Sequence, residues 1–270
     1  MRNDFYVVSF FTTIKRWLRR SFHLSVLYSR VKIQNNDVKF FLRLSETLAS
    51  LREILESDMY NYPQYKEQDK EKIIEFMRRH PFITLIGSDN KGRIEATQIP
   101  VLIEEKGEKI FIHGHIAKKS DHHKAFEENP NVLAIFTGAH TYVSGSWYSG
   151  NPQQASTWNY ISIHARGQIK FLDEVNLIEL LKKLSLHFEN NNRSSSTIYD
   201  NLPVDYKEKL IKAIIAFKIE VTELDNVHKL SQNRDEKSYD NIVQKLKQQQ
   251  GDAKEIGDLM QDRRSKVFPS

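Results

Sequence analysis

The clearest alternation of hydrophobic and polar positions lies in the second half of the segment 134–171. Apolar or small residues fill one face of this stretch, namely Ile161, Ile163, Ala165, Gly167, Ile169 and Phe171. Polar residues fill the other face, namely Ser162, His164, Arg166, Gln168 and Lys170. A period of two is typical of a strand with one buried face, so the pattern predicts a β-strand over 158–172.

An aromatic loop leads into this strand. The loop and its flanks hold Tyr142, Trp147, Tyr148, Trp158 and Tyr160, which include two of the three tryptophans in the chain. Rigid aromatic rings with polar tips suit a planar ligand or a partner surface. The same rings would also close one end of a β-barrel, and the pattern alone leaves both interpretations open.

The periodicity of the remaining chain predicts short strands separated by turns, with few helices. Strands are expected over 82–87, 93–103, 109–115, 132–137, 141–144 and 216–224. Helices are expected over 69–80, 121–128, 174–189, 204–214, 239–249 and 252–263. Many short antiparallel strands favour a closed or nearly closed barrel, so we expect an α+β, mainly β domain with peripheral helices.

Composition narrows the possible chemistry. The 270 residues include no cysteine, which excludes disulfides, thiolate catalysis and cysteine-ligated metals. The formal net charge is +5, but residues 1–58 hold ten Lys/Arg and six Asp/Glu, so the remaining chain carries only +1. The main body therefore lacks the net charge typical of nucleic-acid binding, while a local basic patch stays open.

Residues 1–58 differ in composition from the rest of the chain, because they contain neither glycine nor proline. We expect them to be an upstream extension from a misassigned start, with Met59 as the natural first residue; a basic helical arm is the alternative. The main domain is expected over 59–263, followed by a tail over 264–270. No stretch approaches the roughly 18 apolar residues that span a membrane, and no signal peptide is recognisable, so we expect a cytoplasmic protein.

Motifs of several common activities are missing from the sequence. It contains no G-x-G-x-x-G, no P-loop and no G-x-S-x-G, which disfavours Rossmann-type dinucleotide binding, P-loop phosphoryl transfer and serine hydrolysis. His113 and His115 share one face of a predicted strand, but no carboxylate with ligand spacing accompanies them. We therefore predict hydrogen bonding rather than a metal site, and no catalytic residue can be assigned.

Three further segments carry candidate binding residues. Lys118 and Lys119 precede Ser120, the predicted N-cap of a helix; cations beside helix-start N–H groups bind phosphate, although a surface lysine pair is the simpler interpretation. The small residues Ala96 and Thr97 would let a planar ligand approach a hairpin. The polar cluster 227–233 either caps the last strand or folds over a site.

These segments together resemble the PaiB-type FMN-binding split-barrel family, often described as negative transcriptional regulators. The resemblance covers residues 59–263, and residues 1–58 fall outside it. The matching segments follow the family's order: MYNYPQY at 59–65, PFITLI at 81–86, ATQIPVL at 96–102, GHIAKKS at 114–120, IFTGAHTYVSGSWY at 135–148, STWNYISIHARGQI at 156–169 and HKLSQN at 228–233.

The resemblance implies a six-stranded antiparallel split barrel, related to the pyridoxamine-phosphate-oxidase fold, and a homodimer with FMN at the subunit interface. It puts Ala96 and Thr97 at the isoalloxazine ring, and Lys118, Lys119 and Ser120 near the phosphate. It puts the flavin edge at Ser144, Ser146, Trp147 and Tyr148, from this subunit or from the other one. Trp158 and Asn159 would support that loop.

The chain departs from the family pattern in two places. Gly145 stands where the family favours proline, which is expected to loosen the loop. The segment Ala117–Ser120 replaces an Ala-Arg-Ala-Asn-like stretch, which keeps positive charge and loses the bidentate fork of arginine. Both changes bear on FMN affinity rather than on the fold.

Three functions follow as hypotheses. The first is a negative transcriptional regulator or redox-linked regulatory flavoprotein; the second is a flavin-dependent oxidoreductase acting on an unknown small molecule. The third is a haem-binding split barrel that uses His113 or His115. No helix-turn-helix is recognisable over 59–270, so direct DNA binding would need a local basic surface.

Overall fold

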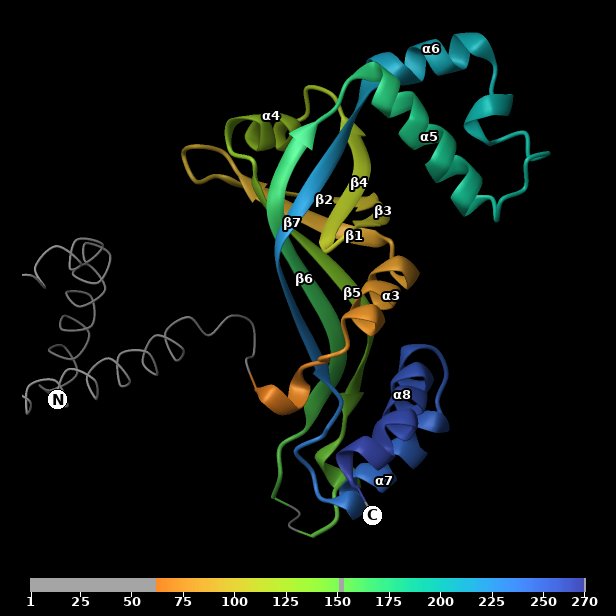
Figure 1. The fold of residues 1–270 in the computed structure, drawn as a ribbon. Coiled ribbons are helices and arrows are strands. Elements are labelled where there is room, and N and C mark those ends of the chain that lie inside the picture. Colours follow the sequence, from red (N-terminus) through yellow and green to blue (C-terminus); the bar gives the residue numbers. More distant parts are fainter. Residues whose placement is uncertain (1–61, 151–152, 270) are drawn as a thin grey trace, which may run out of the picture. The chain divides into compact units, whose positions relative to one another are not determined.

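The computed structural model describes residues 62–150 and 153–269, and its centre is a seven-stranded antiparallel sheet (Figure 1). The strand order is β2-β1-β5-β6-β7-β4-β3. The strands are β1 (Phe82–Ser88), β2 (Ile94–Pro100), β3 (Leu102–Lys106), β4 (Lys109–Ala117), β5 (Asn131–Val143), β6 (Thr157–Phe171) and β7 (Ile214–Lys229). The predicted extension over 1–58 lies outside the described residues.

Helices flank the sheet, and most of them begin at a side-chain cap. They are α3 (Lys70–Arg79), α4 (Asp121–Glu128), α5 (Glu174–Phe188), α6 (Val204–Ala213), α7 (Glu236–Lys247) and α8 (Asp252–Val267), with 3-10 turns η2 (Pro63–Tyr65), η3 (Gly145–Trp147) and η4 (Tyr199–Asn201). Asp69, Ser120, Asp173 and Asp235 accept hydrogen bonds from first-turn N–H groups of α3, α4, α5 and α7. No described helix combines the length and the apolar character needed to cross a membrane.

The single strand expected over 93–103 is wrong, because the first strand ends at Pro100 and a second strand begins at Leu102. Proline has no N–H to donate to a ladder, and the N–H of Val101 donates to the Pro81 carbonyl instead. β2 and β3 consequently lie at opposite edges of the sheet, although only Val101 separates them. The sheet must therefore curl until its edges meet at this corner, but no ladder joins them. The described sheet has seven strands in an open order, and the six-stranded barrel is not confirmed.

The strands expected over 132–137 and 141–144 are one strand, β5, with a register shift between Thr137 and His140. The bulge contains Gly138, where a Cβ would lie 2.6 Å from the Phe76 ring. The last strand also runs further than expected, to Lys229. β5, β6 and β7 therefore continue as a long ribbon beyond the part of the sheet that pairs with β1 and β4.

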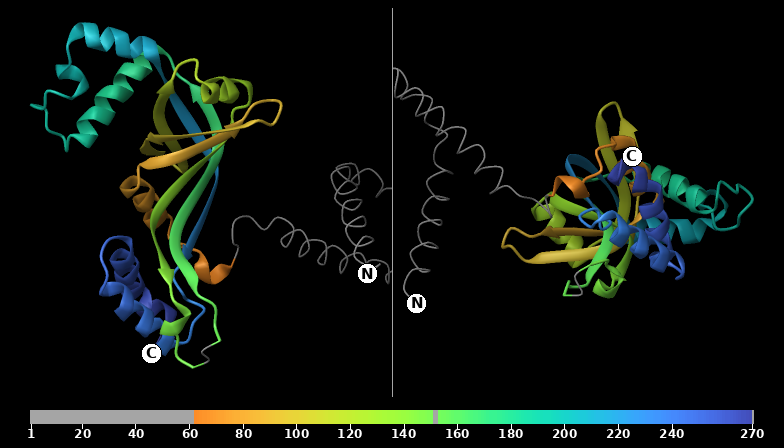
Figure 2. Two further views of the ribbon diagram at one scale, coloured as in Figure 1. Left: turned by 180° about the vertical axis from the view of Figure 1, so that it is seen from behind. Right: turned by 90° about the horizontal axis from the view of Figure 1, so that it is seen from below.

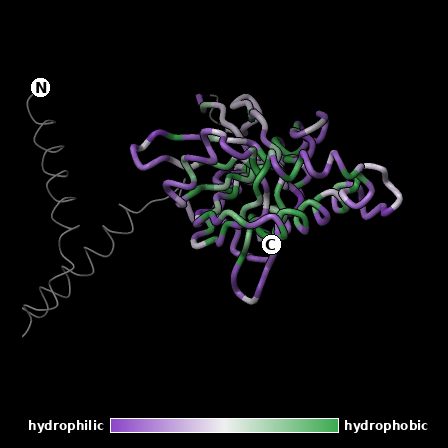
Figure 3. The backbone as a smooth tube through the Cα atoms, turned by 90° about the horizontal axis from the view of Figure 1, so that it is seen from above, coloured by the Kyte–Doolittle hydropathy of each residue, from purple (hydrophilic) through white to green (hydrophobic). Residues whose placement is uncertain are grey.

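The two ends of this ribbon carry different helices (Figure 2). α5 and α6 project from one end and pack around Leu177, Leu180, Leu181 and Leu184 of α5. α7 and α8 lie at the other end, where Tyr239, Ile242, Ile256 and Met260 join the main core of the sheet. Apolar residues gather in the middle of the molecule, while the projecting turns are hydrophilic (Figure 3).

Candidate functional site

The start of α4 forms a tight, hydrogen-bonded turn. The Lys119 N–H donates to Nδ1 of His123 (3.1 Å), and Ser120 Oγ accepts from the His123 N–H (3.3 Å) while donating to the Ala117 carbonyl (2.8 Å). Lys119 has a φ of +64°, in the left-handed region that lysine rarely adopts. His123 is buried, and its Nε2 makes no hydrogen bond but lies 3.6 Å from the Glu127 carboxylate on the next turn of α4. The turn thus presents an exposed Lys119 at a helix start.

Lys118 belongs to a different contact. Its Nζ donates to the Ile211 carbonyl (3.1 Å) and its N–H to the Ala213 carbonyl (2.9 Å), at the C-terminal end of α6. A cation there complements the partial negative charge of the helix end. Of the two lysines predicted near a phosphate, Lys119 is therefore the one that this turn leaves open.

Ala96 and Thr97 lie on edge strand β2, opposite Ile86 and Leu85 of β1. Ala96 is exposed and Thr97 is half-buried. The start of this strand lies beside α4, because Arg93, the residue directly before β2, is 3.9 Å from Asp121 in the first turn of α4. Ala96, Thr97, Lys119 and Ser120 therefore form one group at the β2–α4 end of the sheet.

The aromatic loop forms the η3 turn, which Ser144 caps by accepting a hydrogen bond from the Ser146 N–H (3.2 Å). Gly145 is buried, and a Cβ at this position would lie 2.3 Å from the carbonyl oxygen of Gln154. The expectation that Gly145 loosens the loop is corrected, since the glycine here permits a close approach of two backbone segments.

The aromatic side chains of this end lie in two different environments. Trp147 and Tyr148 pack partly against the main core, and the Arg234 guanidinium lies 4.0 Å from the centroid of the Tyr148 ring. Trp158 is 53% exposed and forms a cross-strand pair with the equally exposed Tyr142, their ring centroids 6.2 Å apart. The two half-exposed rings meet edge to face, at an interplanar angle of 71°, so one ring face at a time is open to a ligand at this end of the ribbon.

Asn159 is fully buried and links the loop to the C-terminal helices. Its Oδ1 accepts from Ser231 Oγ (3.0 Å), and its Nδ2 lies 3.4 Å from Sδ of Met260. These contacts fix Asn159 between the turn after β7 and α8, and its expected role, with Trp158, in supporting the aromatic loop stays a prediction.

The sequence interpretation missed Asp235, which holds the aromatic loop from α7. Its carboxylate accepts from Ser149 Oγ (2.6 Å) and Ser238 Oγ (2.6 Å), while the Ser149 N–H donates to Ser238 (2.7 Å). These hydrogen bonds lower the pKa of Asp235 to about 2. The signal that could have found it is an N-cap aspartate directly after the polar cluster 227–233.

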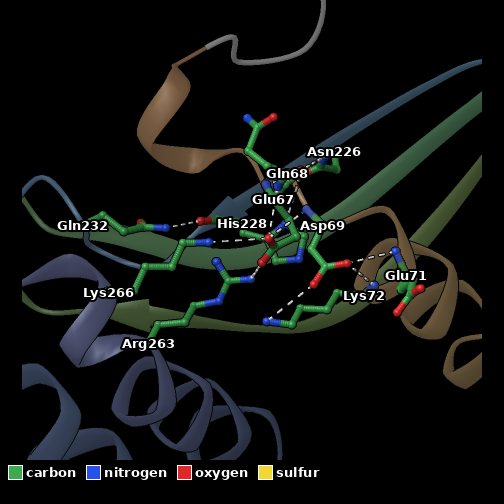
Figure 4. A network of polar contacts seen from close by, with 10 residues as sticks. All are labelled: Glu67, Gln68, Asp69, Glu71, Lys72, Asn226, His228, Gln232, Arg263 and Lys266. Atoms are coloured by element: carbon green, nitrogen blue, oxygen red, sulfur yellow. Dashed lines mark hydrogen bonds and ion pairs between the residues drawn. The ribbon is translucent and has the colours of Figure 1, made fainter.

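A buried charge network fixes the end of β7 beside this loop (Figure 4). Asn226 pairs with the backbone of Glu67 through both amide atoms (2.8 and 3.1 Å), and its Oδ1 lies 3.1 Å from His228 Nδ1. The Glu67 carboxylate pairs with Arg263 and lies 3.6 Å from Lys266. Burial lowers the pKa of His228 to about 4, so this histidine is neutral at physiological pH.

The predicted site residues fall into two groups that one chain does not bring together. Ala96 is next to Ile86, whose other neighbour is Leu133 of β5, whereas Trp158 pairs with Tyr142 of the same strand. At about 3.3 Å per residue, these two points of β5 lie about 25–30 Å apart. That separation exceeds the reach of one FMN molecule.

Each group has features that fit part of FMN. The α4 start offers an exposed cation, Lys119, and the Ser120 hydroxyl, which suit a phosphate. The aromatic end offers the half-exposed ring of Trp158, with Tyr142 against its edge, which suits contact with a flavin ring. FMN would supply the redox chemistry, while these side chains would bind and orient it. The described residues contain no group of three or more His, Asp or Glu able to hold a metal ion.

Comparison with known proteins identifies the family. A family model described as "Putative FMN-binding domain" (FMN_bind_2) matches residues 59–223. The chain is 32% identical over 209 residues to protease synthase and sporulation protein PAI 2 of Bacillus subtilis strain 168, covering 77% of this chain and 99% of that protein. Two solved structures are similar: flavocytochrome Anf3 from Azotobacter vinelandii (17% identity, TM-score 0.44, 63% of this chain and 72% of that chain) and the FAD and haem binding protein from Mycobacterium smegmatis (15%, 0.41, 60% and 72%). Because the family match spans more than half of the chain, and the Bacillus relative aligns over nearly its whole length, the chain belongs to the FMN-binding domain family of the PaiB type, with FMN as its cofactor.

Proposed function

We propose that this protein is a redox-linked regulatory flavoprotein that works as a homodimer, with FMN held between the subunits. The observation that carries the proposal is the distance between the two groups of predicted FMN-binding residues. A second copy brings the aromatic end of one subunit to the α4 start of the other, so that each FMN takes its phosphate contacts from one chain and its ring contacts from both.

A regulatory output agrees with the name of the Bacillus relative, a protease synthase and sporulation protein, and negative control of transcription is the end point that we propose for it. Residues 59–270 carry a net charge of only +1, which disfavours tight direct binding to DNA. The regulatory signal therefore passes through the flavin rather than through a basic surface.

Complementation between two defective variants tests the shared site. Lys119→Ala damages the phosphate group of residues and Trp158→Ala damages the aromatic group, so each homodimer is expected to lose FMN on gel filtration. Co-expression with two different affinity tags yields a heterodimer with one site intact and one site doubly damaged. We expect about one FMN for each heterodimer, measured by flavin absorbance. Absence of FMN from a stable heterodimer would place the site within one chain and refute the proposal.

A flavin-dependent oxidoreductase is the second candidate, favoured by the Tyr148 hydroxyl, which is buried without a partner beside the predicted flavin edge. Flavin-dependent oxidation of NADH or NADPH by the FMN-loaded protein, reduced in Tyr148→Phe, tests it. Haem binding is not proposed, because Nε2 of His113 lies 2.8 Å from Glu104, and His115 lies opposite Ala216 on the face that α5 covers.

A further inference from the structure

The turn that follows β7 is held by its own side chains. Gln232 donates through Nε2 to the His228 carbonyl (2.5 Å) and accepts at Oε1 from the Leu230 N–H (2.7 Å). Ser231 adopts a φ of +61° within this bridge, and its hydroxyl reaches Asn159. The turn delivers Arg234 in a fixed position over the ring of Tyr148.

Arg234 and Tyr148 each carry a buried donor atom that has no hydrogen-bond acceptor. Among the described residues, five buried side-chain polar atoms lack a hydrogen-bond partner, and two of them are Nε of Arg234 and the hydroxyl of Tyr148. A guanidinium Nε–H can only donate, and a phenol hydroxyl donates readily. One oxygen that accepts from both groups would satisfy two orphaned donors at once.

The charge around this pair is positive. Arg234 makes no ion pair with a carboxylate of the described residues, and its side chain donates to the uncharged Oε1 of Gln154 (2.5 Å). Burial, and after it the neighbouring Arg234 cation, lowers the pKa of Lys229. The carboxylate of Asp235, the next residue, accepts hydrogen bonds from Ser149 and Ser238 and does not pair with Arg234. Lys229 Nζ itself donates to Thr157 Oγ1 (2.6 Å), so Arg234 is the group with which an incoming anion would pair.

We propose that Arg234 and Tyr148 form a subsite for the phosphate group of a second ligand, separate from FMN, with Gln154 as the neutral group that the phosphate displaces. The planar Arg234 guanidinium and the Tyr148 hydroxyl offer several donors in different directions, which match the three free oxygens of a phosphate group better than the two oxygens of a carboxylate. The placement of this subsite at the flavin edge rests on the proposed function. The orphaned donors themselves do not depend on it.

The test uses the full chain loaded with FMN and titrated with inorganic phosphate by calorimetry at constant ionic strength. We expect Arg234→Gln to weaken phosphate binding at least tenfold and Tyr148→Phe to weaken it several-fold. Gln154→Glu supplies a carboxylate to Arg234 within the chain and is expected to abolish binding. Lys237→Gln is the matched control, since it removes an exposed cation three residues from Arg234 and should change nothing.

Several outcomes overturn the subsite. Wild-type protein that does not bind phosphate refutes it, and so does acetate binding of equal strength. If Arg234→Gln loses FMN but keeps riboflavin, then Arg234 serves the phosphate of FMN and no second ligand is recognised. Should Arg234→Gln fail to fold, as judged by circular dichroism, Gln154→Glu alone decides. Protein that binds phosphate at Arg234 without retaining FMN contradicts the proposed function and leaves the subsite standing.

Discussion

The charge network behind β7 predicts a strong energetic coupling between Glu67 and Arg263. The Glu67 side chain is 2% exposed, its Oε2 pairs with Arg263, and its Oε1 accepts from the N–H groups of Gln68 (3.0 Å) and Asp69 (3.2 Å). Glu67→Gln keeps an acceptor for the two N–H groups and removes the charge. It therefore leaves the Arg263 guanidinium without its anion.

Removing one partner from a buried ion pair costs about 3–5 kcal/mol. Arg263 is 20% exposed, so water partly solvates the stranded cation, and we take the lower figure, about 3 kcal/mol. For a domain of this size, 1 kcal/mol lowers Tm by about 2–4 °C, which predicts a loss of about 6–12 °C.

Chemical denaturation of the full chain measures the free energy of unfolding for Glu67→Gln, Arg263→Gln and the double variant. We expect a coupling of about 1.5–3 kcal/mol from this cycle. The control is Arg79→Gln, which removes an exposed partner of Glu75 (3.8 Å) and should cost less than about 0.5 kcal/mol. A Glu67–Arg263 coupling no larger than this control value would show that the burial does not strengthen the pair.

Three further predictions concern the ends of β6 and β7. The pKa of His228 falls from 6.5 to about 4 on folding, because of burial, so stability is full above pH 6.5 and declines toward pH 4; unfolding at pH 7 and pH 5 should differ by about 2 kcal/mol more than in His228→Gln. Gly145→Ala forces a Cβ against the Gln154 carbonyl, which should cost about 1–3 kcal/mol on thermal unfolding and weaken FMN retention. Trp158→Ala should change unfolding by less than about 1 kcal/mol, because the side chain is half exposed, yet reduce FMN affinity in a fluorescence titration; unchanged affinity would favour a purely structural aromatic cluster.

The sequence pattern correctly predicted those strands and helices that are determined by residues within the same segment. The alternation over 158–172 corresponds to β6, the predicted N-cap Ser120 marks the start of α4, and the helix expected over 69–80 corresponds to α3. The errors came where a distant contact decides. Thr137 and His140 belong to one strand because the bulge lets the Phe76 ring reach the backbone at Gly138, and nothing in the segment itself announces that contact.

The same distinction holds for the site residues. Residue type and spacing identified Lys118 and Lys119 as a pair, but Lys118 donates to a helix end 93 residues further on, which spacing cannot show. Arg234 escaped notice because its meaning depends on the Tyr148 ring beneath it. A cation above a buried aromatic ring is visible only after the fold has brought the two segments together.

The conformation of the aromatic loop is therefore held by residues near the C-terminal end of the chain, at the start of α7. Asp235 both caps α7 and accepts from Ser149 Oγ, so that one carboxylate aligns the helix and the loop. Ser231 holds Asn159 from the same turn, directly behind Trp158. These contacts join the turn after β7 to both flanks of the loop. A substitution in the turn is therefore expected to shift the loop, and with it the residues proposed to contact the flavin, although the turn itself does not contact the flavin. This physical link explains how the motif 228–233 can belong to a binding site that its own position in the sequence does not reveal.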